Sequence, residues 1–298
     1  MRLQRLVIAL LAAAGTQLAV AAPLDMTGIF EPGRISDHGV FGLTISPDGG
    51  HALWVRSGGK RDVLTIMQAF KVNGQWQAPS AVPFSANPAW QDIDPVFSPD
   101  GKTIIFQSTR PVEGKPERKG FDIWKVAYSG GKWGQPVHLG NDINTDESES
   151  SASIAANGTI YFMKPNGANR SDLWLSRLVG GAYQAPENLG LPVNTAERES
   201  NPYVAPDESY LVYFSSDKRG LGEVDLLISF RENGKWGAPR HIDPPINTSA
   251  GEFCPWVHDG RLYLSRHVMV GDRYIENIHS FPFDPNQYRQ RPPFSPAQ

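Results

Sequence analysis

The sequence predicts an all-β fold, namely a five-bladed β-propeller with four-stranded blades. A turn of the Ser-Pro-Asp-Gly type recurs five times, with its Asp or Asn at positions 48, 100, 157, 207 and 259. Apolar runs rich in β-branched and aromatic residues flank the turns, a pattern that predicts β-hairpins. Repeats of about fifty residues with this β character are typical of propeller blades.

Each repeat divides into four expected strands, and residues 92–128 show the pattern clearly. The first strand is expected at 95–98 and the second at 103–106, joined by a turn in which Pro presets φ and Gly tolerates a positive φ. The third strand opens with an acid, here Asp122. A Gly-rich turn leads into a fourth strand that carries an aromatic residue followed by Pro. Because Pro lacks an N–H, this strand is expected at the outer edge of the blade.

The fifth repeat lacks a fourth strand of its own. After residue 283 the chain runs into a Pro-rich segment, residues 289–298, which we interpret as a tail. The segment 28–35 resembles residues 236–242 of the fourth repeat. We therefore predict that the N-terminal segment pairs with the last blade and closes the ring, which removes an exposed sheet edge. No linker interrupts residues 22–288, which are expected to form one domain.

The first 21 residues have the features of a secretory signal. Arg2 and Arg5 precede an apolar core at 6–14, and Ala-Val-Ala at 19–21 is a small-x-small cleavage site. The apolar core is too short to span a bilayer. We expect a periplasmic or secreted protein that is cleaved near Ala21 and has no membrane span.

Charge and cysteine content limit the partners. The formal net charge is -3, which argues against nucleic acid as a main partner. Cys254 is the single cysteine, so no internal disulfide can form, and it is expected to be a buried small residue. The sequence indicates no cofactor and no metal site; a bound Ca²⁺ is compatible with the acids described below but not indicated. We expect a monomer.

The Ser-Pro-Asp-Gly turn, the following Ile-Phe-x-Ser-x-Arg and the Asp-Ile-Trp or Asp-Leu-Trp strand together resemble the TolB-type, WD-like β-propeller repeats. The resemblance covers roughly residues 40–280. It implies a location in the bacterial envelope and contacts with proteins or glycans. TolB has an extra N-terminal α/β domain and typically six blades, for which these 298 residues leave no room, so a Tol–Pal role is not implied. Such repeats are specific to the fold rather than to an activity.

An acid follows each link between repeats, at Asp92, Glu149, Glu199 and Glu252. The repeat frame places each acid at the entrance of an innermost strand, so the four carboxylates are expected around one mouth of the central channel. The functional interpretation is a cation or polyol site, or the carboxylates of a glycosidase. The alternative is structural, with each acid bonded to a neighbouring loop or a base. The structural role is favoured, because catalytic acids and bases need different environments whereas these acids repeat with the blades.

A second repeated set of acids opens the third strands, at Asp62, Asp122, Asp172 and Asp225. Bases lie at or near the ends of the second strands, among them Arg110, Lys164 and Arg266. We expect these acids and bases to pair between adjacent strands rather than to take part in catalysis.

Residues that break the repeat are better candidates for ligand contacts. Trp90 lies in the first link, Trp256 and His258 replace a smaller residue and the turn Pro in the last repeat, and His38 precedes the first inner strand. The charged segment 111–120 is expected to form a loop at one rim. A loop-borne aromatic beside polar groups suits contact with a sugar or a peptide, although Trp90 would equally serve as a packing plug.

No Ser-His-Asp set stands out in the sequence, and we find no nucleophile elbow, metal-binding His pair or phosphate loop motif, so no catalytic residue is assigned. The expected function is therefore binding, as a protein- or glycan-binding scaffold module of the cell envelope. The alternative is a polysaccharide-active enzyme of glycosidase type that uses carboxylates at the mouth of the channel.

Overall fold

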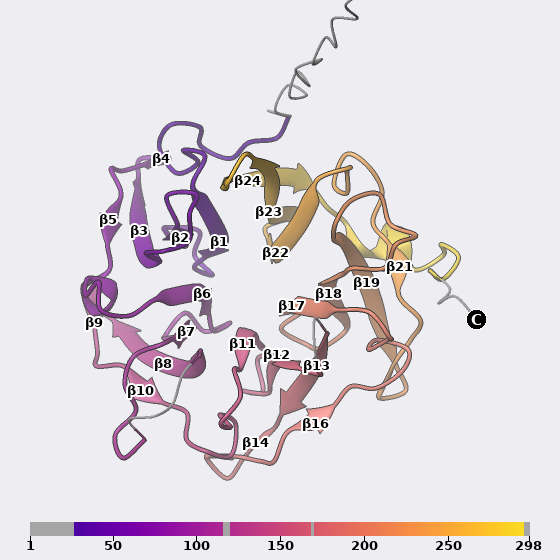
Figure 1. Ribbon diagram of the computed structural model, residues 1–298, viewed down its shortest axis with the longest axis horizontal. Helices are drawn as coiled ribbons and strands as arrows, with labels where there is room; N and C mark the ends of the chain where they lie inside the picture. The colour runs from indigo at the N-terminus through magenta and orange to yellow at the C-terminus, as the bar shows by residue number, and fades with distance from the viewer. Residues whose placement is uncertain (1–26, 116–119, 168–169, 295–298) are drawn as a thin grey trace, which may run out of the picture.

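A computed structural model describes residues 27–115, 120–167 and 170–294. The expected signal at 1–21 and part of the charged loop 111–120 lie outside these residues. The described chain forms a five-bladed β-propeller, which confirms the predicted fold class (Figure 1). Its helices are two short 3-10 turns, η1 (Pro83–Ser85) and η2 (Pro285–Tyr288). Within the described ranges, no helix has the length and apolar character needed to cross a membrane.

The first three strands of each blade follow one another from the centre of the ring outward, and blades 1 to 5 follow the chain. The innermost strands are β1 (Val40–Ile45), β6 (Asp92–Phe97), β11 (Ser150–Ile154), β17 (Glu199–Val204) and β22 (Gly251–His258). The second strands are β2 (His51–Arg56), β7 (Thr103–Ser108), β12 (Ile160–Pro165), β18 (Tyr210–Ser215) and β23 (Arg261–Val270). The third strands are β3 (Thr65–Val72), β8 (Asp122–Ser129), β13 (Ser171–Ser176) with its short extension β14 (Leu178–Val179), β19 (Asp225–Glu232) and β24 (Arg273–Pro282).

The repeated turn joins the first and second strands as predicted. In blade 2, Asp100 Oδ1 accepts hydrogen bonds from Ser98 Oγ at 2.6 Å and from the backbone N of Lys102 at 3.0 Å. Gly101 has a φ of 70°, a conformation that favours glycine. The Ser, Asp and Gly of the motif are therefore required by the local geometry of a tight hairpin.

The fourth strands differ from the expectation of one continuous strand. Each consists of two pieces of two residues: β4 (Gln75–Trp76) and β5 (Ser80–Ala81), β9 (Lys132–Trp133) and β10 (Val137–His138), β15 (Ala182–Tyr183) and β16 (Glu187–Asn188), β20 (Lys235–Trp236) and β21 (Arg240–His241). The repeated prolines Pro79, Pro136, Pro186 and Pro239 lie between the two pieces. Since Pro cannot donate to the neighbouring strand, the pairing is interrupted there.

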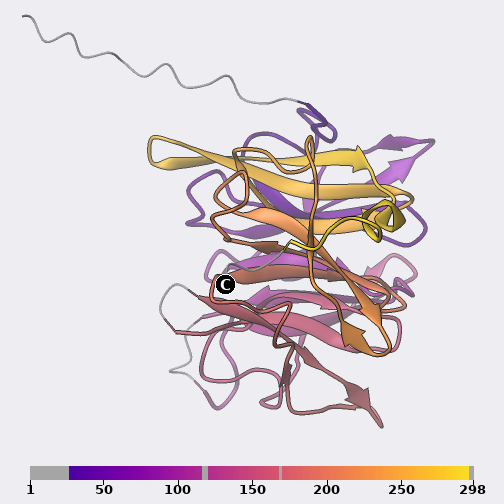
Figure 2. The same cartoon turned by 90° about the vertical axis from the view of Figure 1, so that its right-hand side faces the viewer.

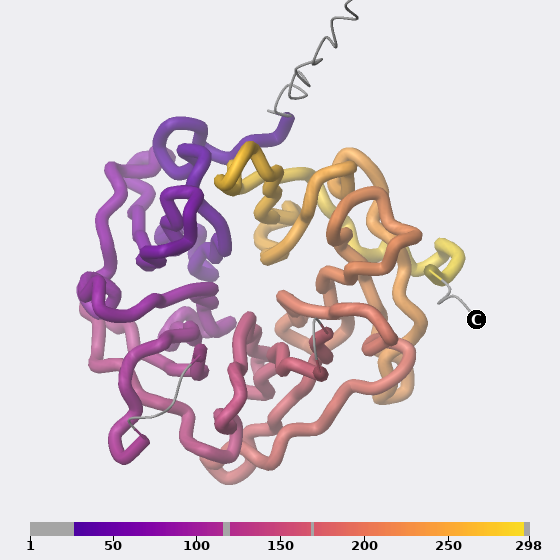
Figure 3. Tube along the Cα trace, in the orientation of Figure 1, coloured from indigo at the N-terminus to yellow at the C-terminus, as the bar shows by residue number. Residues whose placement is uncertain are grey.

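The N-terminal segment closes the ring, as predicted. Ile29 forms an antiparallel bridge with His279 of β24, and the backbone N of Phe30 donates to the carbonyl O of Ile278 at 2.8 Å. In Figure 3 the indigo start of the described chain lies beside the yellow β24. The last blade thus takes its outer edge from the opposite end of the chain.

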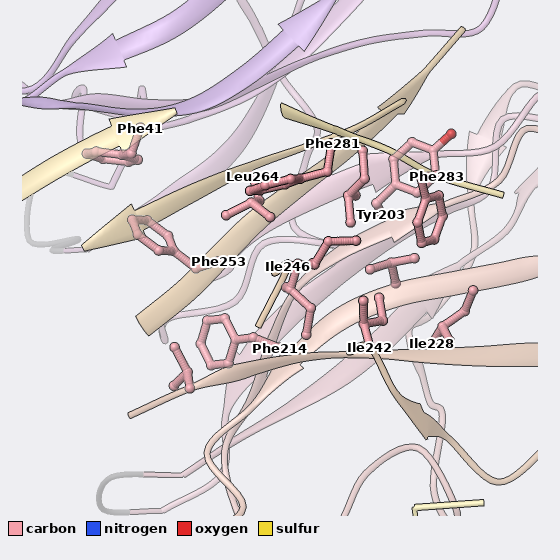
Figure 4. Packing of buried hydrophobic residues seen from close by; sticks show 14 of the residues in the cluster. Phe41, Tyr203, Phe214, Ile228, Ile242, Ile246, Phe253, Leu264, Phe281 and Phe283 are labelled. Carbon is pink, nitrogen blue, oxygen red and sulfur yellow. The ribbon is translucent and has the colours of Figure 1, made fainter. Parts of the chain in front are cut away.

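A large hydrophobic cluster joins blades 4 and 5. Phe214, Ile228 and Ile242 of blade 4 pack with Phe253 and Leu264 of blade 5 in the view of Figure 4. The Pro-rich segment continues this packing as far as residue 294. Tyr288 is buried against Phe283, and the ring of Phe294 lies 5.4 Å from that of His241 on blade 4. Residues 285–294 therefore form a strap across these two blades.

Figure 2 shows the blades from the side, with their strands running between the two faces of the ring. Neighbouring inner strands run in the same direction, because the contacts between them follow both strands in the same order. Asn201 contacts Ser151 and Val204 contacts Ser153, and likewise Asp94 lies beside Gly42 and Phe97 contacts Thr44. All hairpin turns of the Ser-Pro-Asp-Gly type accordingly lie on one face, which we call the turn face. The links that lead into the inner strands lie on the opposite face, called the link face.

Candidate functional site

The four acids after the links are buried and bonded within their own repeats. In three of them the carboxylate accepts hydrogen bonds from the backbone N and the hydroxyl of the Thr four residues earlier. The pairs are Thr145 with Glu149, Thr195 with Glu199 and Thr248 with Glu252, at 2.5 to 3.1 Å. The repeated Asn-Thr link thus clamps the carboxylate at the start of each inner strand.

A base completes three of these sites. Arg110 lies 2.8 Å from Asp92, Lys164 lies 3.5 Å from Glu149, and Arg266 lies 2.8 Å from Glu252. Glu199 takes a hydrogen bond from Ser215 Oγ at 3.1 Å instead. Burial raises the pKa of the Glu199 and Glu252 carboxyls, and the hydrogen bonds from their Thr residues offset part of that effect. Because each link acid is bonded to groups of its own repeat, these contacts support a structural role for the four acids.

The predicted pairing of these bases with the third-strand acids is wrong. His138 Nε2 lies 3.0 Å from Asp122, Asn188 Nδ2 donates to Asp172 at 2.8 Å, and His241 Nε2 lies 3.6 Å from Asp225. The partner comes from the outer strand of the same blade, while Asp62 is exposed. The bases extend toward the link acids because the second strand lies beside the first strand as well as beside the third.

The repeat-breaking residues are spread over the molecule. Trp90 lies beside Arg110, whose guanidinium carbon is 5.6 Å from the indole centroid, so Trp90 and Asp92 share one cation. His38, with a φ of 72°, lines a crevice of about 330 Å³ between blades 5 and 1. His258 ends β22 on the turn face, whereas Glu252 lies near its start. Six residues of extended strand separate His258 from the link acid by roughly 20 Å.

Trp256 is the predicted candidate that reaches the central axis. Its ring packs edge-on against Tyr203 at 5.3 Å, and both residues line an opening of about 250 Å³ at the centre of the turn face. Trp256 also lines a smaller cavity of about 30 Å³ further along the axis. That volume is enough for about one water molecule.

Among the residues that line the smaller cavity are five at equivalent positions of the inner strands, which the sequence analysis missed. They lie two residues after the link acid, or after Val40 in blade 1, and are Gly42, Asp94, Ser151, Asn201 and Cys254. Each has a positive φ, and the strand register shifts at each position as in a β-bulge. The bulges turn these residues toward the axis. The signal in the sequence is a column of small or polar residues inside otherwise apolar strands.

Asp94, Ser151, Asn201 and Cys254 form one hydrogen-bonded group, which together with Gly42 we call the axial cluster. Ser151 Oγ donates to Asp94 Oδ2 at 3.0 Å, and Asn201 Nδ2 donates to Ser151 Oγ at 2.8 Å. Cys254 Sγ lies 3.5 Å from Asp94 Oδ1. A Cβ on Gly42 of blade 1 would lie 3.1 Å from the same oxygen. The Asp94 carboxylate therefore fills the space that a side chain at position 42 would need.

The electrostatics of the cluster depend on burial. Burial raises the pKa of Asp94 above its usual range, and the hydrogen bonds from Ser151 and Cys254 and the charge of Arg61 offset part of that effect. Burial, together with the nearby Asp94, raises the pKa of the Cys254 thiol well above its usual range. The thiol therefore stays protonated at neutral pH and is a poor nucleophile.

Arg61 supplies positive charge from the link-face side. Its guanidinium lies 5.1 Å from the ring centroid of Phe41, 5.5 Å from that of Phe253 and 4.3 Å from that of Tyr274. Glu276 accepts from its Nε at 3.0 Å. This cation is held by aromatic faces and one carboxylate, which fixes its position relative to the axial cluster.

The chemistry of the axial cluster centres on one carboxyl group. Asp94 is the single carboxylate among the five axial positions, whereas glycoside hydrolysis uses two carboxyl groups, about 5 to 9.5 Å apart. Within the described residues, no group of three or more His, Cys, Asp or Glu side chains is placed to hold a metal ion. The cluster offers hydroxyl, amide and carboxyl groups beside an apolar wall that includes Trp256.

No protein-family model matches the chain, and no curated protein matches its sequence. Solved structures do match its fold. A TolB from Agrobacterium tumefaciens is 14% identical with a TM-score of 0.51, over 82% of this chain and 91% of that protein. The α-L-arabinofuranosidase from Lactobacillus brevis is 13% identical with a TM-score of 0.52, over 84% of this chain and 94% of the enzyme.

A GH62 hydrolase solved with xylotriose is 10% identical with a TM-score of 0.52, over 83% of this chain and 94% of the hydrolase. At such low identities a likeness speaks for the fold and not for an activity. The chain is a β-propeller similar in architecture to a TolB, to an α-L-arabinofuranosidase and to a GH62 hydrolase.

Proposed function

We propose that this protein is an exported β-propeller of the cell envelope that binds a protein or a glycan at its central axis, as a recognition or scaffold module. The observation that carries the proposal is Asp94, a buried carboxyl bonded to side chains of three other blades beside an axial cavity. Burying such a group costs stability, and proteins keep costly polar groups at functional sites. The signal features of residues 1–21 support export.

In this proposal the ligand enters from the opening lined by Tyr203 and Trp256. The aromatic rings contact its apolar surface, and the axial cluster binds a polar group at its tip. Link acids such as Glu252 hold the blades together and position the inner strands. His258 lies at the rim of the opening, where it contacts the ligand only if the ligand extends beyond the axis.

The alternative is a polysaccharide-active enzyme with Asp94 as one of its carboxyls. A carboxyl whose pKa is raised by burial suits a general acid. Hydrolysis would require a second carboxylate near Asp94, which the other four axial positions do not supply. Binding is therefore the better-supported function.

The experiment compares the wild-type protein with Asp94→Asn on a glycan array and in pull-downs from envelope extract. We expect Asp94→Asn to keep its fold by circular dichroism and to lose at least about ten-fold in affinity for the captured ligand. Glu232→Gln, an exposed carboxylate on β19, is the control and should bind like the wild type.

Equal binding by Asp94→Asn and the wild type would show that the cluster is only structural. A panel of polysaccharides tests the alternative function in parallel. Turnover by the wild type that disappears in the folded Asp94→Asn variant would establish the enzyme and reject the binding module.

A further inference from the structure

Three cavities on the turn face join into one groove. The first, of about 730 Å³, lies between blades 5 and 1; the second is the axial opening of about 250 Å³; the third, of about 420 Å³, lies between blades 2 and 3. Pro47 and His258 line both the first and the second cavity. Ser98 and Pro99 line both the second and the third. The groove therefore crosses the whole turn face and passes over the axis.

The charges along this turn-face groove balance. Its acids are the turn residues Asp48, Asp100 and Asp259, and its bases are Lys71, Lys125 and Arg261. A groove with equal numbers of both signs gives no net attraction for a polyanion or a polycation. Its charge pattern fits a neutral ligand.

The floor of the groove offers few backbone partners. Pro47 and Pro99 have no N–H, and the turn amide of Gly49 already donates to the carbonyl O of Ser46 at 2.8 Å. A bound peptide brings one N–H and one C=O per residue, each of which needs a partner when buried. This surface does not provide that ladder of partners, which disfavours an extended peptide.

Side-chain oxygen atoms are available instead. Asp48 and Asp100 each use Oδ1 to stabilise their own turns, and within the described residues neither Oδ2 accepts a hydrogen bond. Both side chains are exposed. Carboxylate oxygens are strong acceptors for hydroxyl groups, and the half-buried rings of Trp256 and Tyr183 provide apolar faces along the same groove.

We propose that the turn-face groove binds a neutral, linear, hydroxyl-rich polysaccharide strand laid across the axial opening. This inference rests on the glycan form of the proposed function and extends it from the axis to the whole face. The strand would contact carboxylates of blades 1 and 2 on either side of Trp256. Affinity should therefore increase with chain length.

The test measures binding of cellohexaose, xylohexaose and chitohexaose, and of the matching disaccharides, by isothermal titration calorimetry. The variant is the double substitution Asp48→Asn and Asp100→Asn, which keeps the turn acceptor Oδ1 and removes the charged oxygen. Asp207→Asn is the matched control. It occupies the same turn position in blade 4, accepts from the backbone N of Ser209 at 3.0 Å, and does not line the groove.

At least one hexasaccharide should bind at least about ten-fold more tightly than its disaccharide. The double variant should lose at least about ten-fold in hexasaccharide affinity, while Asp207→Asn should bind like the wild type. An equal loss of hexasaccharide affinity in Asp207→Asn would overturn the proposed binding by the groove. The loss would then result from a weakened turn and not from a lost contact with the ligand. Stronger binding of polygalacturonate or of a neutral unstructured peptide would overturn the choice of ligand.

The two proposals fail in different ways. If Asp94→Asn abolishes hexasaccharide binding while the double variant retains it, the ligand sits at the axis alone and the groove is overturned. If no hexasaccharide binds but an envelope protein is captured in an Asp94-dependent manner, the groove inference fails and the binding function stands.

Discussion

Ser151 Oγ donates a hydrogen bond to Asp94 Oδ2 across 3.0 Å, so that a residue of blade 3 is bonded to a residue of blade 2 on the axis of the propeller. Asn201 of blade 4 extends the chain of bonds by donating to Ser151 at 2.8 Å. Inner strands of neighbouring blades are thereby linked through side chains at one level of the channel. The stability of the ring and the chemistry of its centre depend on the same carboxyl.

Asp94→Asn should change the pH dependence of stability. Burial raises the pKa of Asp94 in the folded state, so the folded protein binds this proton more tightly than the unfolded chain does. The stability contributed by the protonated form is present below the unfolded pKa, about 4, and is lost as pH rises through the folded pKa. The variant should therefore gain stability relative to the wild type as pH rises from about 4 to about 8. Urea unfolding across this range measures the difference, and a pH-independent difference would contradict the prediction.

Gly42→Ala should destabilise the protein more than Gly74→Ala. Both glycines have a positive φ, 66° and 79°, which costs an alanine about 1 kcal/mol. The new Cβ at position 42 would also lie 3.1 Å from Asp94 Oδ1, whereas no atom of the described residues lies within 4 Å of a Cβ at position 74. We expect losses of about 2 to 3 kcal/mol and about 1 kcal/mol in the free energy of unfolding. Equal losses in the free energy of unfolding would mean that the Asp94 side chain moves away from the new Cβ at no energetic cost.

Glu252→Gln should cost more than Glu199→Gln, although the two residues occupy the same place in the repeat. The first change removes the carboxylate charge that faces the buried guanidinium of Arg266 at 2.8 Å, and breaking a buried ion pair costs about 3 to 5 kcal/mol. Glu199 accepts hydrogen bonds from neutral groups of Thr195 and Ser215, for which the expected loss is about 1 kcal/mol. Chemical denaturation measures both. A smaller loss for Glu252→Gln would contradict the structural role of the ion pair.

Phe30→Ala should weaken the closure of the ring. The Phe30 ring packs edge-on against Tyr263 at 5.2 Å and Trp76 at 6.3 Å, and so joins the N-terminal segment to blades 5 and 1. For a half-buried Phe we expect a loss of about 2 to 3 kcal/mol. Val63→Ala, at an exposed apolar side chain, is the control and should change stability by less than about 0.5 kcal/mol. If thermal melting of Phe30→Ala matches that of the control, this contact does not hold the ring closed.

The repeated turn and the closure of the last blade could be predicted because their causes are local or periodic. Pro99 and Gly101 specify a hairpin by their own backbone preferences. The likeness of the segment 28–35 to a fourth strand was visible in the sequence and is confirmed by the bridge between Ile29 and His279. The break of each fourth strand was missed, since the repeated Pro was interpreted as an edge residue and not as an interruption.

By itself, the sequence determined the number of blades, the hairpin turns and the ends that meet, because these follow from backbone preferences repeated at a constant spacing. Only the tertiary structure decided that Asp94, Ser151, Asn201 and Cys254 meet at the axis, and that Arg266 faces Glu252 rather than an acid of the third strand. The physical reason is that a β-bulge redirects a side chain by a local change of φ, which leaves the apolar periodicity of the strand almost unaltered. Contacts between blades form when the ring closes, and their distances depend on the packing of all five blades at once.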